Sequence, residues 1–289
     1  MRRTDAIPAF AVLAIATALL WPPAQARPER IVSLNLCSDQ LLLLLADRSR
    51  IGSITHLASD PKASALADGA AGVRVNHGLA EEILPLNPDL VLAGTFTTRP
   101  TVFLLRALGY PVVELPVAAS LDDVRANIRT VALAIGEAER GEALIDAFDR
   151  KLPGPPPEAT EDKPLAALYW ANGFTSGRGT LANAAVEAAG FRTLGRELGL
   201  TGTGQLPLET LLASDPDVLV LGRQRDEPAL ANEIFRHPAL ERAFAERPRV
   251  SIPDHLWICG TPFVAEAVAR LSALRESAGF VGAVGTAEE

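Results

Sequence analysis

Short apolar runs alternate with helix-like segments through the first 120 residues. Four of the runs are typical of strands: 31–35 (IVSLN), 51–55 (IGSIT), 89–94 (DLVLAG) and 111–115 (PVVEL). The segments between them predict helices at 41–46, 80–86 and 101–109. Strands that are apolar throughout and that alternate with helices favour a parallel sheet covered on both faces. The pattern therefore predicts an α/β lobe over residues 27–120.

A helical pattern fills residues 121–152. Ser120 and Asp123 have the spacing of a capping box in front of it, and the apolar residues Val124, Ile128, Val131 and Ile135 recur at helical spacing. Gly136 interrupts the pattern. Residues 153–164 (PGPPPEATEDKP) are rich in proline and charge and have no period, so we expect a linker there.

The α/β pattern restarts after the linker. We expect strands at 165–170 (LAALYW), 217–222 (DVLVLG) and 249–253 (RVSIP), and helices at 180–190, 208–214 and from 261 to about 277. Thr261-Pro262 is a favourable start for the last helix, because proline suits the first helical position. The sequence thus predicts a second α/β lobe over residues 165–278 and a tail at 279–289.

One unit of the sequence is repeated in both halves. Residues 81–94 read EEILPLNPDLVLAG and residues 209–222 read ETLLASDPDVLVLG. Aligning the two Pro-Asp pairs also aligns Glu81 with Glu209 and Gly94 with Gly222. The repeat indicates two similar lobes, although αβ units share turn chemistry and the match is open to chance.

Charge and the N-terminus limit the function classes. The chain has 289 residues and a formal net charge of -8, and its basic residues are dispersed, so nucleic acid is not an expected partner. Arg2-Arg3, the apolar run 9–20 and Ala24-Gln25-Ala26 are typical of a signal peptide. We expect residues 1–26 to be removed by cleavage after Ala26 and the protein to be periplasmic; an uncleaved anchor is the alternative.

Several segments together resemble a known family. They are PERIVSLN, LPLNPDLVLAG, the helical stretch to residue 152, YWANGFTSGRGTLANAAVEAAGF (169–191), LPLETLLASDPDVLVLG and HPALERAFAERPRVSIPDHLW (237–257). In order and spacing they resemble the periplasmic substrate-binding proteins of ABC importers for cobalamin and ferric siderophores. The resemblance implies two Rossmann-like lobes with parallel sheets, one long backbone helix that joins them, and a ligand cleft between the lobes.

The resemblance also implies two docking residues. In that family one glutamate on each lobe binds arginines of the permease dimer, and by motif position these are Glu81 and Glu209. Arginine recognises carboxylates through two hydrogen bonds, which suits the role. The alternative is that each glutamate is an acidic first-turn residue favoured by the helix dipole.

Ligands of open α/β sheets bind beyond the carboxyl ends of the strands. We therefore expect the ligand to contact residues that follow strands, namely Asn35, Cys37, His56, Phe96, Trp170, Phe174, Arg178, Arg223, His255 and Trp257. The aromatic residues offer flat apolar contact for a macrocycle; for Trp257 we favour the cleft over the lobe core, and for Trp170 both interpretations stay open. The histidines suit metal coordination or a hydrogen-bonding loop, and the arginines suit an anionic ligand or solvent.

The two cysteines fall at predicted strand ends on opposite lobes. Cys37 and Cys259 are expected to form a disulfide, because an exported protein meets an oxidising compartment. Such a bridge would close more than 200 residues and stabilise the fold by about 4–5 kcal/mol in the chain-entropy model. A thiolate pair at a metal-bearing ligand and two unrelated buried thiols are the alternatives.

We therefore expect a monomeric binding protein that delivers a metal chelate to an inner-membrane ABC permease. Cobalamin or another corrinoid, a ferric siderophore and haem all suit the scaffold, and no resident cofactor or metal is expected. The alternative is an exported enzyme, but the sequence has no GxSxG, no HExxH and no P-loop.

Overall fold

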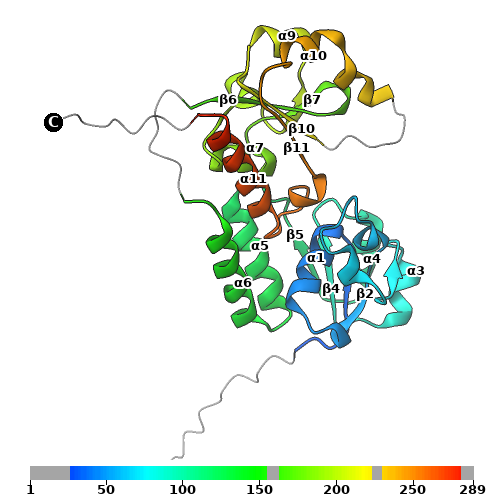
Figure 1. Ribbon diagram of the computed structural model, residues 1–289. Helices are drawn as coiled ribbons and strands as arrows, with labels where there is room; N and C mark the ends of the chain where they lie inside the picture. The colour runs from blue at the N-terminus through cyan, green and yellow to red at the C-terminus, as the bar shows by residue number, and fades with distance from the viewer. Residues whose placement is uncertain (1–26, 155–162, 223–229, 281–289) are drawn as a thin grey trace, which may run out of the picture.

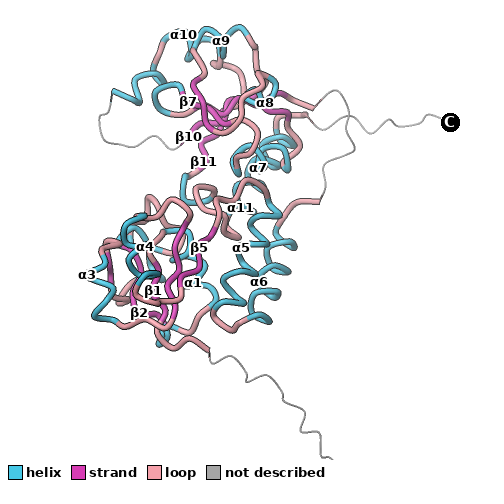
Figure 2. The backbone as a smooth tube through the Cα atoms, turned by 180° about the vertical axis from the view of Figure 1, so that it is seen from behind, coloured by secondary structure: helices cyan, strands magenta, loops and turns pink. Residues whose placement is uncertain are grey.

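The computed structural model describes residues 27–154, 163–222 and 230–280. The predicted signal peptide, most of the predicted linker, Arg223 and nearly all of the predicted tail lie outside these residues. Two α/β lobes lie one above the other, and helices α5 (Leu121–Ala134), α6 (Ala138–Lys151) and α11 (Val264–Ser277) run along one side of them (Figures 1 and 2). Among the described residues, each helix is too short or too polar to cross a membrane.

Within the described residues, the first lobe holds a five-stranded parallel sheet of order β3-β2-β1-β4-β5. The strands are β1 Ile31–Ser33, β2 Ile51–Thr55, β3 Val75–Asn76, β4 Leu90–Gly94 and β5 Val112–Leu115. The helices are α1 Leu36–Leu45, α2 Ala67–Ala70, α3 Ala80–Ile83 and α4 Arg99–Ala107, with 3-10 turns at Arg48–Arg50, His56–Ser59 and Leu84–Leu86. The predicted parallel sheet is confirmed.

Two details of this lobe differ from the sequence predictions. Helix α1 begins at Leu36 rather than at residue 41, because the side chain of Asn35 accepts a hydrogen bond from the Cys37 N–H at 2.9 Å and caps the helix early. Strand β3 was not predicted, because two residues give no apolar run; it pairs with the end of β2 at the edge of the sheet.

The segment between the lobes is helical, but it forms two helices rather than the one long helix that the resemblance implies. Gly136 has a φ of 74°, which ends α5 and turns the chain back. Gly141 of α6 faces Ala132 of α5, and Arg129 forms an ion pair with Glu142 at 2.7 Å. The two helices are therefore packed antiparallel.

The described part of the second lobe holds a four-stranded parallel sheet of order β11-β10-β6-β8. The strands are β6 Leu165–Tyr169, β8 Arg192–Thr193, β10 Val218–Gly222 and β11 Arg249–Ile252, and β7 Phe174–Ser176 pairs antiparallel with β9 Thr203–Gln205. The helices are α7 Leu181–Ala188, α8 Leu194–Glu197, α9 Leu208–Ala213 and α10 Pro238–Ala243, with 3-10 turns at Ala171–Gly173, Leu230–Arg236 and Asp254–Leu256. The short elements β7, β8, β9, α8 and α10 were not predicted.

The repeated sequence unit adopts the same structure in both lobes. Helices α3 and α9 begin at positions 80 and 208, which are 128 residues apart, and the turns that follow place Asn87 and Asp215 in the left-handed region with φ of 43° and 49°. In each turn the Pro-Asp aspartate holds the adjacent strand. Asp89 accepts from the Arg30 N–H at 2.9 Å, and Asp217 accepts from the Leu165 N–H at 2.7 Å.

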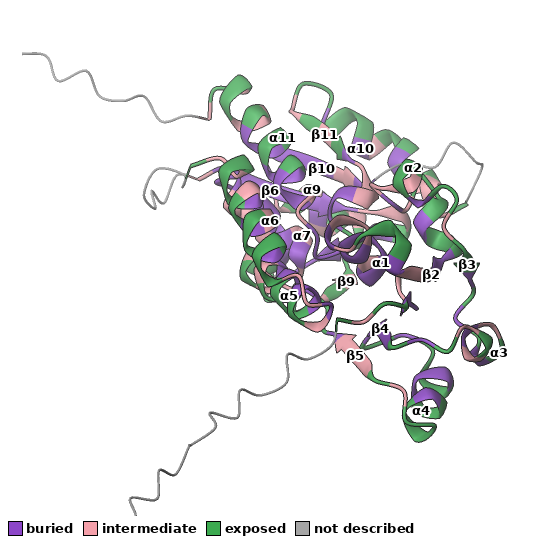
Figure 3. Cartoon of the chain, turned by 90° about the horizontal axis from the view of Figure 1, so that it is seen from below, coloured by how far each residue is buried: buried purple, intermediate pink, exposed green. Residues whose placement is uncertain are grey.

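A hydrophobic core runs through both lobes and the helices beside them. The same cluster of buried residues includes Leu42 of α1, Ile128 of α5, Val186 of α7 and Leu271 of α11. Figure 3 shows buried segments, such as strands β6 and β10, in the interior and exposed surface on the outer helices. Because one apolar cluster is shared, the helices fix the lobes against each other and leave the carboxyl ends of both sheets facing a cleft.

Candidate functional site

Two adjoining cavities lie between the lobes. The larger, which we call the aromatic pocket, has a volume of about 360 Å³ and is lined by Val117, Ala118, Trp170, Ser176, Gly179, Thr180, Leu181, Ala182, Thr203, Asp254, Trp257 and Ile258. The smaller, the disulfide pocket, has a volume of about 100 Å³ and is lined by Asn35, Cys37, Leu41, Gly94, Thr95, Phe96, Leu115, Pro116, Val117, Ala118, Asn127, Ile258 and Gly260. Val117, Ala118 and Ile258 belong to both linings, so the two cavities form one cleft.

Two tryptophans form one wall of the aromatic pocket. Trp170 directly follows β6, and Trp257 follows the 3-10 turn after β11. Their rings lie edge to face, with centroids 6.5 Å apart and planes at 80°. Trp257 is 5% exposed and belongs to the hydrophobic core as well as to the pocket lining, whereas Trp170 is half-buried. Trp257 thus packs in the core and also borders the pocket.

Hydroxyl groups also line the aromatic pocket. Thr180 caps α7 by accepting from the Asn183 N–H at 3.3 Å, and its Oγ1 lies 2.6 Å from the Oγ of Ser176. Thr203 of β9 adds a third hydroxyl to the lining. The pocket therefore offers a broad apolar surface with a few hydrogen-bonding groups, which is typical of small-molecule sites.

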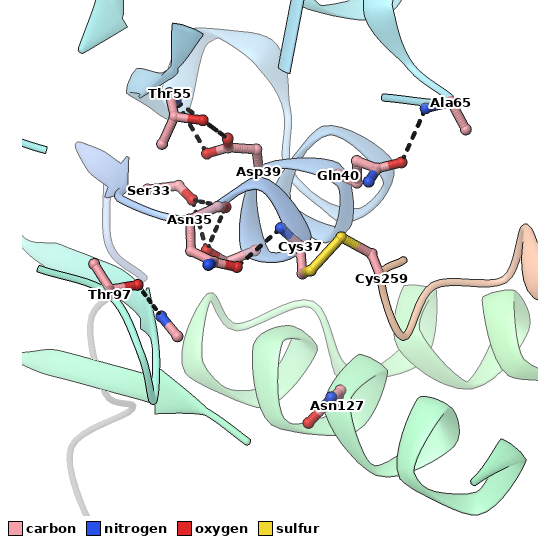
Figure 4. The surroundings of a disulfide bond; sticks show 12 residues. Ser33, Asn35, Cys37, Asp39, Gln40, Thr55, Ala65, Thr97, Asn127 and Cys259 are labelled. Carbon is pink, nitrogen blue, oxygen red and sulfur yellow. Dashed lines mark hydrogen bonds between the residues drawn. A yellow bond between two sulfur atoms is a disulfide. The ribbon is translucent and has the colours of Figure 1, made fainter. Parts of the chain in front are cut away.

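The disulfide pocket lies at the carboxyl end of β1. Cys37 and Cys259 are joined by a disulfide with their Cα atoms 5.0 Å apart, as the sequence predicted (Figure 4). The bridge links the start of α1 to the loop before α11. Next to it, Gly260 approaches Ala118 so closely that a Cβ at position 260 would lie 2.3 Å from that of Ala118. The disulfide and this close contact hold the two lobes together at the cleft.

Phe96, Val117 and Ile258 expose apolar surface to the cleft. Their exposed fractions are 86%, 67% and 59%. Large apolar side chains that are this exposed and that gather at a concave site mark a surface for a ligand or partner. Phe96 was predicted from its position after β4, but Val117 and Ile258 were not. The sequence signal for Ile258 was its place between Trp257 and Cys259, two residues that were both predicted to lie at the cleft.

A buried carboxylate lies behind the disulfide pocket. Asp39 of α1 is fully buried, and its Oδ2 accepts from Thr55 Oγ1 at 2.5 Å while the Thr55 N–H donates to both carboxylate oxygens at 3.2 Å. Burial raises the pKa of Asp39 to about 6, and hydrogen bonds from Ser33 and Thr55 offset part of that rise. Asp39 thereby ties α1 to the end of β2.

His56 lies at the end of β2 and faces another histidine. Its ring stacks on His77 with centroids 5.0 Å apart, and the Nδ1 of His77 is 2.9 Å from Glu82. A hydrogen bond from the His77 backbone N–H, with help from its side chain, lowers the pKa of Glu82. Both histidines are exposed, and neither belongs to the pocket linings. His77 was not among the predicted site residues, because β3 was not foreseen.

The remaining predicted ligand residues have varied positions. His255 is half-buried on the turn before Trp257, and Phe174 is 38% exposed on β7; neither belongs to the two linings. Arg178 lines a separate pocket of about 510 Å³ together with Arg192, Arg196 and their ion-pair partners Glu187 and Glu197. Arg223 lies outside the described residues. Ligand contact by each of the ten residues stays a prediction.

The two predicted docking glutamates occupy equivalent places. Glu81 is the second residue of α3 and Glu209 is the second residue of α9, and both are exposed. Helix α3 belongs to the first lobe and helix α9 to the second, and the two helices lie far apart (Figure 1). Within the described residues, no group of three His, Cys, Asp or Glu side chains is arranged to hold a metal ion.

Comparison with curated proteins finds relatives of one kind. The chain is 28% identical over 211 residues to proteins named cobalamin-binding protein in two strains of Halobacterium salinarum. The match covers 69% of this chain and 55% of those proteins, so the chain spans little more than half the length of these relatives.

The fold is that of several solved periplasmic proteins. The apo periplasmic heme-binding protein RhuT from Roseiflexus sp. RS-1 superposes with a TM-score of 0.69 at 23% identity, covering 86% of this chain and 98% of that one. The periplasmic vitamin B12 binding protein BtuF of Vibrio cholerae superposes with a TM-score of 0.62 at 18% identity, covering 87% and 98%.

The sequence profile of the family described as periplasmic binding protein matches residues 31–254, from β1 to the turn before Trp257. This range is more than half of the chain and includes both lobes and the helices between them. The chain belongs to the periplasmic binding protein family.

Proposed function

We propose that this protein is the solute-binding component of an ABC importer and that it captures a corrinoid-type metal chelate. The observation that carries the proposal is the aromatic pocket. Side chains from both lobes line it, and its Trp170–Trp257 wall offers flat apolar contact to a large ring. The curated relatives named cobalamin-binding protein support the same ligand class.

The dimensions of the cleft suggest how such a ligand sits. A volume of about 360 Å³ is at the lower end for small-molecule sites. A corrin-sized ligand therefore places one part against the tryptophans and extends over Val117 and Ile258 toward the disulfide pocket. The hydroxyls of Thr180 and Thr203 and the amide of Asn35 then face its polar substituents.

Delivery is assigned to the two exposed glutamates. Glu81 and Glu209 would form charge-assisted hydrogen bonds with arginines of a permease dimer, one on each lobe. Their equivalent positions in a repeated unit support this role, since a two-fold partner needs two matched contacts. Export through a signal peptide cleaved after Ala26, and action as a monomer, are parts of the same proposal.

A fluorescence titration tests the ligand. The Trp21→Phe variant of the chain leaves Trp170 and Trp257 as its tryptophans. Cyanocobalamin, haemin and ferrioxamine B all absorb light strongly enough to quench a nearby indole. We expect saturable quenching by cyanocobalamin at micromolar concentration or below, with unchanged ligand absorbance after prolonged incubation.

Each other outcome has a definite meaning. Preferential binding of haemin or ferrioxamine B would replace the corrinoid and keep the importer role. Slow conversion of a bound ligand would favour an exported enzyme that uses the same cleft. Absence of quenching by all three would overturn the proposed ligand class.

A further inference from the structure

We propose that Gly222 is a positioning residue that sets where Trp170 lies and thereby shapes the aromatic pocket. Gly222 is the last residue of β10, and a Cβ built on it would lie 2.0 Å from Cδ1 and 2.6 Å from Nε1 of Trp170. Real Cβ contacts are never that short, so the ring occupies the space that any other residue would fill. The inference rests on the proposed function for its ligand readout.

The register of the sheet explains why these two residues meet. Strands β6 and β10 pair in parallel with Tyr169 opposite Leu221, so Trp170 and Gly222 are the next residues along each strand. The indole lies across the end of β10, beside Gly222, and also borders the aromatic pocket. From that position it packs edge to face with Trp257, and both rings line the pocket.

The backbone of Trp170 is held on both sides. Its N–H donates to the Phe174 carbonyl at 2.8 Å, and its own carbonyl accepts from the Gly173 N–H at 3.0 Å. A clash at position 222 is therefore relieved by rotation of the indole rather than by movement of the main chain. Such a rotation would change the contact of the ring with Trp257 and the shape of the aromatic pocket that both rings line.

Space, and not backbone conformation, requires glycine here. Gly173 has a φ of 72°, a region that favours glycine, whereas the φ of Gly222 is not positive. The backbone conformation at position 222 is thus one that residues other than glycine can adopt. The contact with Trp170 is what excludes a side chain, which makes the residue a part of the binding site that touches no ligand.

The equivalent position in the first lobe supports the inference that contact with a neighbouring side chain requires glycine at this strand end. Gly94 ends β4, and a Cβ there would lie 3.0 Å from the side-chain amide of Asn35, which follows β1. Both lobes therefore place a glycine at the strand end beside the residue that follows the central strand. The tolerance differs, because 3.0 Å is relieved by a small shift of an amide and 2.0 Å is not.

The test compares Gly222→Ala with Gly69→Ala in the Trp21→Phe background. Gly69 lies on α2, where a new Cβ meets nothing closer than 3.8 Å. We expect Gly222→Ala to reduce the near-ultraviolet circular dichroism of the coupled Trp170–Trp257 pair while the far-ultraviolet spectrum is kept. We also expect its affinity for cyanocobalamin to fall by at least about fivefold, the scale of an overpacked contact. Gly69→Ala should match the parent in both.

A double variant separates positioning from folding. In a Trp170→Ala background the space beside residue 222 is empty, so adding Gly222→Ala should change the affinity by less than about twofold, as expected when one residue acts through the other. If Gly222→Ala alone fails to fold, recovery of the fold in the double variant supports the same steric coupling.

An unchanged near-ultraviolet spectrum in Gly222→Ala would overturn the inference. An equal loss of affinity in the parent and Trp170→Ala backgrounds would overturn it as well. Cyanocobalamin that does not bind the parent refutes the proposed corrinoid ligand, while the spectrum still tests Gly222.

Discussion

The two lobes share a frame but differ at the ends of their strands. In both, a short helix leads through a left-handed residue and a Pro-Asp pair to a buried strand that ends in glycine. Beside that glycine, the first lobe presents Asn35, which caps α1, and the second presents Trp170, which lines the cleft. The repeated frame fixes the positions, and the residues placed there decide what each lobe contributes to the site.

A second pair of equivalent contacts differs in charge. In the first lobe, Asp39 of α1 accepts from Thr55 at the end of β2 at 2.5 Å; in the second, Asn183 of α7 accepts from Thr193 of β8, also at 2.5 Å. Each contact ties a helix, α1 or α7, to a strand of the parallel sheet in its own lobe. One uses an ionisable carboxyl and the other a neutral amide, so pH should act on the first lobe alone through this contact.

The largest effect, a loss of uptake, is expected from the two docking glutamates, which occupy equivalent positions in the two lobes. Replacing both docking glutamates, Glu81→Ala with Glu209→Ala, should abolish uptake of cyanocobalamin by cells that carry the permease, because both carboxylate contacts are lost. Binding of the ligand to the purified double variant should be unchanged. Uptake of radiolabelled ligand and a fluorescence titration measure the two effects separately.

A matched control uses exposed glutamates outside the repeated unit. Glu139→Ala with Glu276→Ala removes the same total charge from α6 and α11, and uptake should be kept. If the two single variants, Glu81→Ala and Glu209→Ala, lose uptake unequally, then the lobes are not equivalent toward the permease. Normal uptake in the Glu81/Glu209 variant would show that neither residue is needed for docking to the permease.

The repeated frame is also the part of the structure that the sequence predicts best. Continuous apolar runs such as 89–94 and 217–222 identify buried strands, and the Pro-Asp pairs identify the turns before them. The sequence could not reveal β3 or the stacking of His56 on His77, because those features depend on tertiary pairing of short polar segments. Gly136 was recognised as an interruption, but only the structure shows that it reverses the chain.

At the site, the sequence predicts ligand contact for residues that follow strands, and five of these residues line the cleft. Asn35, Cys37, Phe96 and Trp170 line the cleft, and so does Trp257. Arg178 has the right position along the chain, yet it follows β7, which belongs to a separate small sheet. Val117 was not predicted, because the sequence around it has only the features of an ordinary loop.

The next largest effect concerns the bond between the lobes. Cys37→Ser with Cys259→Ser should lower the free energy of unfolding by up to about 5 kcal/mol, because the closed loop spans 222 residues and its loss frees the unfolded chain. Urea unfolding measures the change. Dithiothreitol should shift the wild type toward the variant and leave the variant unmoved; a wild type that reductant does not affect would show that the bridge is not what stabilises it.

The Asp39 contact predicts a pH dependence of stability. The pKa of the folded carboxyl, about 6, lies above its ordinary value of 3.8, so the folded state binds the proton more tightly than the unfolded state does. Its contribution is therefore fully present below pH 3.8 and is lost as the pH rises through 6. The loss amounts to about 3 kcal/mol, from roughly two pKa units.

Asp39→Asn converts this contact into the neutral form that the second lobe already has. Its free energy of unfolding relative to the wild type should rise by up to about 3 kcal/mol between pH 4 and pH 8, as measured by urea titrations at each pH. Carboxyls with lowered pKa, such as Glu82 and Glu142, act in the opposite direction but are present in both proteins and cancel. A constant difference across this range would mean that Asp39 does not titrate as burial requires.

The smallest effect separates the aromatic contributions of the two lobes. Trp170→Ala should weaken cyanocobalamin binding by about 1–3 kcal/mol, the scale of an aromatic anchor in a pocket. Phe96→Ala should weaken it by less than about 1 kcal/mol, because the phenyl ring is 86% exposed and rim contacts contribute little. Because Phe96 is so exposed, its removal should leave the thermal midpoint unchanged, and the fluorescence titration then reports binding alone. If Phe96→Ala weakens binding as much as Trp170→Ala does, then Phe96 becomes buried against the ligand when the ligand binds. The difference between the lobes would then be a property of the unliganded protein and not of the complex.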